Sequence, residues 1–220
     1  MSFTPNQLET AISEAKLKSM ERKKRKFVET VELSIGLRDI DLKNPVNRIN
    51  IEALVPNDLG GSTSSVAVFA DGDIAIKSKE SGLPTFGKDD IEQLSKEPKK
   101  VKNLANEYEY FLAEPPLMAI VARFLGKILG PRGKMPKPLP PRVEIDKFVE
   151  RYNRTVKLRI KATPVINVKV GKATQSNKKL AENAAAILQT LTTKLPKGAQ
   201  HIRAIHFKTT MGPSIKTERN

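Results

Sequence analysis

Apolar residues recur along this chain with two different periods, and the change between the periods marks the expected helices and strands. Residues 8–15 carry apolar side chains at helical spacing behind a start signal at Thr4, so a helix is predicted near the N-terminus. From Phe27 to Ile35 apolar side chains occupy alternate positions, which predicts a strand. Val28 and Glu29 break this alternation, so the strand is expected to begin irregularly.

The middle of the chain alternates short strands with helices. Strands are expected over 65–70, 74–76 and 108–113, and helices over 88–96 and 115–128. The Gly- and Ser-rich residues 60–65 precede this section and are the best candidate for a hinge. Strands that alternate with helices in this way predict a layered α/β unit with a largely parallel sheet.

The last section returns mainly to strands after a short helix over 145–152. Strands are expected over 156–161, 165–170 and 202–209, with a helix over 180–191 between the last two. In the first of these strands apolar residues alternate with Lys157, Arg159 and Lys161, which indicates one buried face and one cationic face.

Both ends of the chain are expected to share one domain. The strands of either end, among them one expected over 49–55, are too few for a stable sheet, but together they make about four strands with two helices. Because chain termini often lie close together, an inserted middle domain is compatible with this arrangement. We therefore predict an α/β protein with a discontinuous terminal domain and an inserted second domain.

The net charge of +15 over 220 residues points to a polyanionic partner. Solubility alone needs a net charge of only about 2 to 8 on a small domain. The charge is also unevenly distributed: residues 51–98 hold 4 basic and 9 acidic side chains, whereas residues 143–220 hold 16 and 5. An acidic stretch thus separates two basic ends.

Composition also excludes several classes of protein. The chain has no cysteine and two histidines, which rules out disulfides, thiol catalysis, cysteine-ligated zinc and a histidine-rich metal site. Neither a metal nor a cofactor is expected. It shows neither the apolar core of a signal peptide nor an apolar run of membrane-spanning length, so a cytoplasmic protein is expected.

A glycine-rich basic stretch, Gly126–Lys134, has some features of a phosphate-binding loop but fails as one. No glycine stands five residues before Gly133, and Met135 occupies the place of the Ser or Thr that would hold magnesium. We interpret it as a sharply turning basic loop. Its cations that are expected to reach RNA phosphates are Arg132, Lys134 and Lys137.

Two carboxylate clusters have simple structural explanations. Asp71 and Asp73 fit a solvated turn, and Asp89, Asp90 and Glu92 fit the acidic first turn of a helix. Serine and lysine residues show no recognisable nucleophile setting. The sequence therefore argues against an enzyme.

Two segments allow two interpretations each. The basic run Lys16–Lys26 is either a solvated helix face or a phosphate contact. The segment Lys208–Ser214 is either a strand end with a tight turn, or a place where the backbone approaches RNA and threonine hydroxyls bind 2′-hydroxyls or phosphates. Chemistry alone does not separate these alternatives.

Four motifs in order along the chain carry a resemblance. They are KFVETVE (26–32), LGPRGKMP (129–136), VGKA (170–173) and TTMGPS (209–214). With these motifs the chain resembles the ribosomal protein L-one family of universal large-subunit stalk proteins, in its archaeal form.

The resemblance implies a particular architecture and function. The expected domains are a discontinuous α+β sandwich with an antiparallel-type sheet (1–63 plus 156–220) and an inserted Rossmann-like three-layer α/β domain (64–155). The first domain would bind 23S-type ribosomal RNA at the mobile stalk near the tRNA exit site, and also a matching site in its own messenger RNA to repress translation. Exit-site tRNA is a further expected partner, and off the ribosome the protein would be a monomer.

The resemblance also implies a set of RNA-binding residues: Lys26, Phe27, Thr30, Glu32, Arg203, Lys208, Thr209, Thr210, Met211 and Gly212. Phe27 and Met211 would offer apolar surface to sugars and bases, although Phe27 could instead pack in the core against Val31. Glu32 would accept a hydrogen bond from a 2′-hydroxyl or a base amine. The chain departs from the family pattern at Gly60-Gly61, where a basic residue often follows the glycine, and at Ala204, which replaces a small hydroxyl residue of bacterial members.

Overall fold

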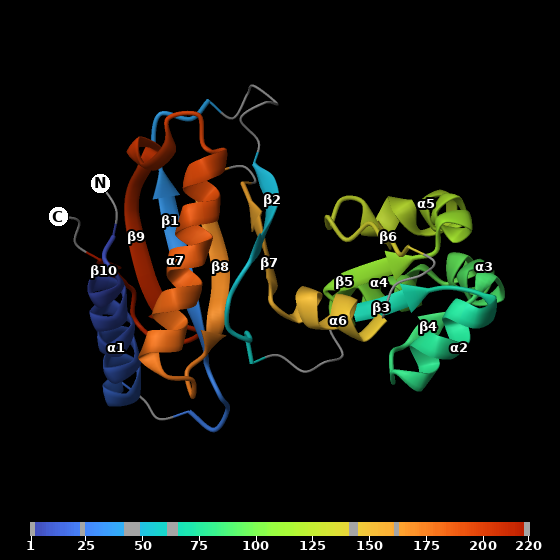
Figure 1. The fold of residues 1–220 in the computed structure, drawn as a ribbon, viewed down its shortest axis with the longest axis horizontal. Helices are drawn as coiled ribbons and strands as arrows, with labels where there is room; N and C mark the ends of the chain where they lie inside the picture. The colour runs from blue at the N-terminus through green and yellow to red at the C-terminus, as the bar shows by residue number, and fades with distance from the viewer. Residues whose placement is uncertain are drawn as a thin grey trace. The chain divides into compact units, whose positions relative to one another are not determined.

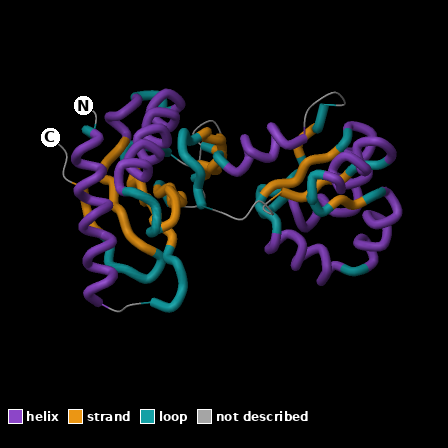
Figure 2. The backbone as a smooth tube through the Cα atoms, turned by 60° about the horizontal axis from the view of Figure 1, so that its bottom comes forward, coloured by secondary structure: helices purple, strands orange, loops and turns teal. Residues whose placement is uncertain are grey.

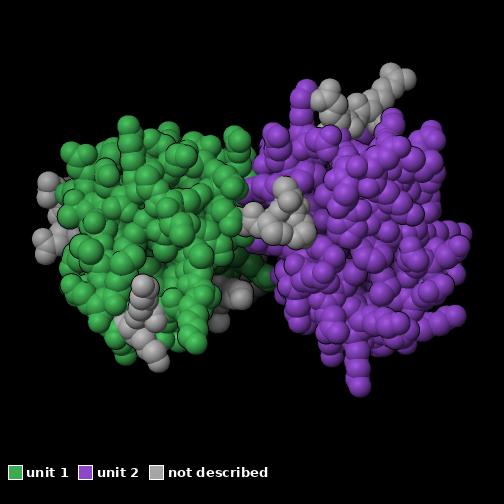
Figure 3. All heavy atoms as spheres, turned by 90° about the horizontal axis from the view of Figure 1, so that it is seen from below, with its two compact units in different colours: residues 1–61, 154–220 green, residues 62–153 purple. Residues whose placement is uncertain are grey.

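The computed structural model describes residues 3–22, 25–41, 49–60, 66–140, 145–160 and 163–217. Several residues considered above lie outside the described residues, namely Lys23 and Lys24 of the basic run, Gly61–Ser65 of the expected hinge, and Lys161. The chain divides into two compact units (Figure 3). Unit 1 contains residues 1–61 and 154–220, and unit 2 contains residues 62–153.

A four-stranded antiparallel sheet forms the centre of unit 1 (Figure 1). Its strands, in spatial order, are β10 (Ile215–Thr217), β9 (Ile202–Thr209), β1 (Thr30–Leu37) and β8 (Val165–Lys172). β1 from the N-terminal part therefore lies between two strands from the C-terminal part, and Val31 pairs with Thr209 on one side and Gly171 on the other.

One face of this sheet is buried beneath two helices. α1 (Pro5–Arg22) and α7 (Asn177–Lys194) pack against it, and residues such as Leu8, Leu33 and Ile187 share one core with 0% exposure. Along β1 buried and half-buried residues alternate over its whole length. The opposite face, which holds Glu32 and Lys208, is therefore open to solvent, as is common for antiparallel sheets.

The strands of unit 1 differ in two ways from the expectation. β2 (Asn50–Leu54) and β7 (Thr155–Arg159) form a separate two-stranded antiparallel sheet that adds Ala53 and Leu158 to the same core. β10 is too short for a periodic signal in the sequence. The short 3₁₀-helix η3 (Gly198–His201) leads into β9.

Unit 2 is built on a parallel sheet with helices on both sides of its strands (Figure 2). The strand order is β4 (Thr85–Phe86), β3 (Val66–Phe69), β5 (Tyr110–Ala113) and β6 (Lys137–Pro138), and each neighbouring pair is parallel, as the alternation predicted. The helices are α2 (Gly72–Glu80), α3 (Lys88–Lys96), α4 (Pro98–Glu107), α5 (Pro115–Leu129) and α6 (Ile145–Asn153). The two faces of the sheet belong to separate apolar clusters, one around Phe69 and Phe111 and one around Val68 and Leu112.

Two predictions about local structure are wrong, and one helix was missed. Residues 74–76 lie in α2 and not in a strand, because the chain turns into a helix at Gly72, which has a φ of 58°. In this helix the side chain of Ile76 is 58% exposed. β1 begins at Thr30 rather than Phe27. α4 was not expected, although Pro98 at its start and the buried Val101 and Leu104 are typical of a helix.

Among the described residues, none of the helices combines the length and apolar character needed to cross a membrane.

Candidate nucleic-acid interface

The candidate interface begins at the turn Thr209–Gly212, which follows β9 and is closed by a hydrogen bond from the Gly212 amide to the Thr209 carbonyl (3.1 Å). α1 approaches this turn so closely that a Cβ at position 212 would lie 2.9 Å from Ser19 Cβ and would also overlap the Thr209 hydroxyl. Glycine is therefore required here for the close approach of α1.

Glu29, just before β1, connects the turn to α1. Its two carboxylate oxygens accept hydrogen bonds from the Ser19 hydroxyl (2.7 Å) and from the Met211 amide (2.9 Å). The buried Thr209 hydroxyl donates in turn to Ser19 Oγ (2.8 Å). One carboxylate thus fixes three segments of the chain, namely the end of α1, the entry to β1 and the C-terminal turn.

The ionised form of Glu29 is favoured by this arrangement. Partial burial of the carboxyl group raises its pKa, but hydrogen bonds from the Ser19 hydroxyl and the Met211 amide, the adjacent Thr209 hydroxyl and the nearby charge of Arg25 together lower the pKa below its ordinary value. Glu29 is therefore an acceptor at neutral pH, and it holds the turn from inside the protein.

A second set of hydrogen bonds joins the turn to β1. Thr210 Oγ1 accepts from the Thr30 amide (3.0 Å) and donates to the Thr30 carbonyl (3.3 Å). Because a hydroxyl has one proton and two lone pairs, one acceptor position of Thr210 is left for a ligand. Lys172 Nζ donates to Thr30 Oγ1 (3.3 Å), which brings a cation of β8 to the same place.

Apolar side chains stand exposed at this end of the sheet. Phe27 and Val28 are 55% and 52% exposed, and Met211 is 52% exposed. The alternative that Phe27 packs in the core against Val31 is wrong, because Phe27 lies in a bend before β1 while Val31 is fully buried in the strand. Exposed aromatic and thioether groups beside cations suit unstacked RNA bases.

The other predicted site residues fall into three groups. Lys26 is exposed next to Phe27, and Glu32 and Lys208 face each other on the open side of the sheet with 4.0 Å between Lys208 Nζ and Glu32 Oε2. Thr209 is 1% exposed, so its hydroxyl supports the turn and is not available to RNA. Arg203 is exposed at the other end of β9, roughly 20 Å from the turn at the usual rise of a strand.

Sequence reasoning missed three residues that build this site. Ser19 continues the apolar helical stripe of Leu8, Ile12 and Ala15, and a buried hydroxyl in such a stripe is a signal for a specific partner. Glu29 was noted as a break in the strand pattern and as a member of the KFVETVE motif, but not as a site residue. Lys172 belongs to the VGKA motif, but its contact with β1 depends on strand pairing.

The cations of the glycine-rich loop in unit 2 have partners within the protein. Arg132 Nη1 donates to Asn106 Oδ1 (2.6 Å) and to the Lys102 carbonyl (3.2 Å), and Lys134 Nζ donates to the carbonyls of Ala105 and Tyr108 (2.8 Å each). Both cations therefore bind α4, and Lys134 does so at its C-terminal end, where free carbonyls favour cations. Lys137 Nζ lies 5.6 Å from the ring centre of Tyr152. These three cations therefore have contacts within the protein, and their contact with RNA phosphates stays a prediction.

The described residues of unit 2 also lack the features of a nucleotide site at the expected place. In a parallel sheet ligands bind where the strand order reverses, here at the carboxyl ends of β3 and β5. Asp71 and Glu114 lie there, the Glu114 carboxylate accepting from the Asp71 amide (3.3 Å). Two carboxylates repel a phosphate. Among the described residues, groups of three or more potential metal ligands are absent as well.

Comparisons with known proteins agree with the sequence motifs. Residues 17–213 match the model of the ribosomal protein L1p/L10e family. The large ribosomal subunit protein uL1 of Thermofilum pendens is 45% identical over 213 residues, which cover 96% of this chain and 93% of that protein. The uL1 protein of Thermococcus kodakarensis is 38% identical over 100% of this chain and 100% of that protein. The uL1 protein of Pyrococcus horikoshii is 38% identical over 99% of this chain and 98% of that protein. This family consists of ribosomal proteins rather than enzymes, which agrees with the sequence-based expectation. The chain belongs to the ribosomal protein L1p/L10e family.

Proposed function

We propose that this protein is a structural constituent of the large ribosomal subunit that binds 23S-type ribosomal RNA at the mobile stalk near the tRNA exit site. The family relationship and the names of its relatives support the ribosomal role. The net charge of +15 supports a polyanionic partner. In this proposal residues 1–63 plus 156–220 form the RNA-binding domain and residues 64–155 form a Rossmann-like second domain.

The observation that carries the proposal is the turn held by Glu29. Its internal hydrogen bonds fix the backbone of Thr210 and Met211 beside β1, while the side chains of Met211 and Phe27 remain exposed. A rigid turn that presents apolar side chains next to Lys172 and Lys26 suits stacking on bases, with the cations binding phosphates. Glu32 adds an acceptor that distinguishes RNA by its 2′-hydroxyl.

The proposal extends to three further properties. The same surface would bind a matching site in the protein's own messenger RNA and repress its translation, since one surface accepts any RNA with the same local structure. Exit-site tRNA would be a transient partner of the assembled stalk, and the protein would be a monomer off the ribosome. Co-sedimentation with large subunits at high salt tests the ribosomal role, and a protein found only with messenger RNA would favour a purely regulatory function.

Filter binding to the stalk fragment of 23S-type RNA tests the proposal directly. We expect a nanomolar dissociation constant that rises with salt. Thr210→Ala and Met211→Asp should weaken binding by at least about tenfold, because they alter the turn itself. Arg22→Ala, at the exposed end of α1, should have a much smaller effect because it removes one screened charge. Equal effects of the three variants, or equal affinity for unrelated hairpins, would contradict the proposal.

A further inference from the structure

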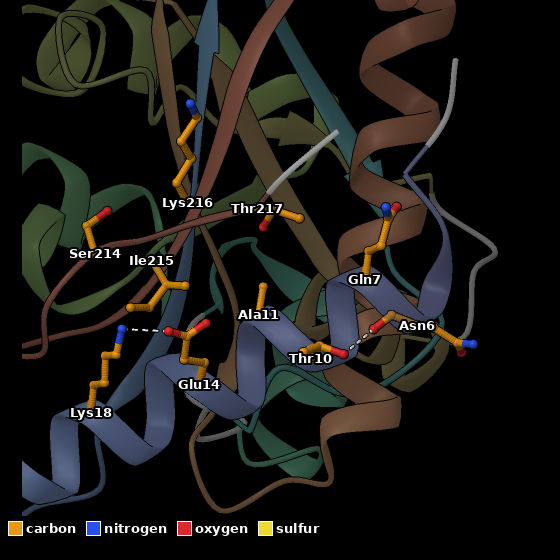
Figure 4. A pocket seen from close by; sticks show the side chains of 10 residues that line it. All are labelled: Asn6, Gln7, Thr10, Ala11, Glu14, Lys18, Ser214, Ile215, Lys216 and Thr217. Carbon is orange, nitrogen blue, oxygen red and sulfur yellow. Dashed lines mark hydrogen bonds and ion pairs between the residues drawn. The ribbon is translucent and has the colours of Figure 1, made fainter. Parts of the chain in front are cut away.

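A groove runs between α1 and β10 on unit 1 (Figure 4). It has a volume of about 660 Å³. In Figure 4 Ala11 and Glu14 point from α1 toward the segment that carries Ile215 and Thr217. The residues that line this α1–β10 groove are Asn6, Gln7, Thr10, Ala11, Glu14, Lys18, Ser214, Ile215, Lys216 and Thr217.

Two features of the groove suit the binding of a ligand. β10 is the last strand of its sheet and pairs with β9 on one side, so within the described part of the chain its other edge has no strand partner. Thr217 is 5% exposed, and its hydroxyl has no hydrogen-bond partner among the described residues. Buried hydroxyls in proteins are nearly always bonded, so a ligand that donates to or accepts from Thr217 fits this place.

The groove is continuous with the candidate RNA interface. Ser19, which bonds Glu29, is followed toward the N-terminus of α1 by Lys18, Glu14 and Gln7 along the groove wall. On the other wall Ser214 comes two residues after Gly212. From Lys18 to Gln7 the groove follows α1 for about 16 Å at the rise of a helix. A strand that leaves the turn thus has a path along α1.

We propose that the α1–β10 groove holds a strand of the same RNA and extends the contact beyond the turn. This inference rests on the proposed function. Lys18 and Lys216 would bind phosphates, and the hydroxyls of Thr10, Ser214 and Thr217 would bond riboses and 2′-hydroxyls. Glu14 forms an ion pair with Lys18 (2.5 Å), which reduces the repulsion of its carboxylate toward phosphates.

An extended peptide is the competing occupant, because a free strand edge beside a helix also suits strand addition. Two observations favour RNA. The groove continues from the candidate interface, and the charges that line it, two lysines and one glutamate, are net positive on a strongly basic protein. A peptide would gain most from an apolar groove, whereas this lining consists mainly of amides, hydroxyls and charged groups.

The first test measures binding of the full chain to two RNAs, the minimal stalk fragment and the same fragment with single-stranded extensions at both ends. Thr10→Glu places a carboxylate in the groove at an exposed helix position, and Ser13→Glu adds the same charge to α1 outside the lining. We expect Thr10→Glu to weaken binding of the extended RNA about tenfold and Ser13→Glu to change it less than about twofold. The minimal fragment should not distinguish the two variants.

Equal effects of the two glutamate variants on the extended RNA would overturn the groove proposal. If Thr210→Ala still weakened the minimal fragment, the proposed function would stand while the groove proposal failed. If Thr210→Ala had no effect on either RNA, the proposed function itself would fail.

Photo-crosslinking provides a second readout that does not depend on affinity. A benzophenone amino acid at position 10 should crosslink to the extension of the RNA, and the same group at position 13 should not. In assembled large subunits, a crosslink from position 10 to a protein instead of RNA would assign the groove to a peptide and overturn the proposal.

Discussion

Two glycine-containing motifs of this protein, one in each unit, use their polar groups in opposite ways. In unit 2 the loop after α5 carries Arg132 and Lys134, and both cations donate hydrogen bonds to carbonyl groups of α4 or of the residue that follows it. In unit 1 the turn after β9 bonds inward through its backbone and hydroxyls, so the Met211 side chain stays exposed. The cations of the more basic motif thus bond groups within the protein, whereas the nearly uncharged motif leaves the Met211 side chain exposed at the surface.

This comparison shows why charge in a sequence is a poor guide to a binding surface. A cation near the carbonyls of a helix end is satisfied there, and its side chain is then oriented toward the protein. A turn whose backbone is held from inside leaves its side chains free and in a fixed position. Recognition of RNA needs the second arrangement, with long-range attraction by lysines as support.

The largest effect on RNA affinity should come from a side chain that fills the space beside Gly212. Gly212→Val would push the turn away from Ser19 and break the bonds to Glu29, so we expect at least about a hundredfold loss of RNA affinity and an overpacking cost of about 1–3 kcal/mol in unfolding free energy. Filter binding and urea unfolding measure the two quantities.

A matched control is Gly126→Ala in α5, where an added Cβ meets no heavy atom within 4 Å. Alanine there should leave RNA affinity unchanged and stabilise the helix by about 0.5–1 kcal/mol. Loss of RNA binding in this control would contradict the division of roles between the two motifs.

The next effect concerns the basic loop of unit 2. Replacing Arg132 and Lys134 together by alanine removes hydrogen bonds from charged donors to the end of α4, and we expect unit 2 to lose about 1–3 kcal/mol of stability. Thermal unfolding should show this change. The salt dependence of RNA binding should stay the same, and a smaller slope would show that these cations do contact phosphates.

The smallest effect is the pH dependence of the contribution that Glu29 makes to the stability of the protein. Its pKa in the folded protein is lowered from the ordinary value of 4.5, so its contribution to stability is complete above about pH 4.5 and is lost as the pH falls through the folded value. Urea unfolding of the wild type and of Glu29→Gln should therefore differ at pH 7, and the difference should shrink toward pH 3. A constant difference over this range would show that ionisation of Glu29 does not hold the turn.

Local structure was largely predictable from the sequence. β9 and α3 have the predicted bounds, because each carries a clear period between turn residues. Ile74–Ile76 was misassigned because three residues do not distinguish a strand from a helix. β10 gave no signal, since a strand of three residues gains its stability from pairing with β9.

The candidate site was predictable only in part, because most of its residues act across long distances in sequence. Thr30 and Thr210, and likewise Ser19 and Thr209, touch only because β1 pairs with β9 and α1 packs over them. Phe27 could not be assigned to core or surface by alternation, since it precedes the regular strand.

By itself the sequence determined the positions of most helices and strands, the basic character of the chain ends and the family, because these depend on residue types and their local order. The tertiary structure alone decided which polar and cationic groups are available to a ligand. A side chain is available only if neighbouring segments do not satisfy it, and those segments are brought together by strand pairing and core packing. For this reason Thr209, Arg132 and Lys134 support the fold, while Phe27 and Met211 remain exposed.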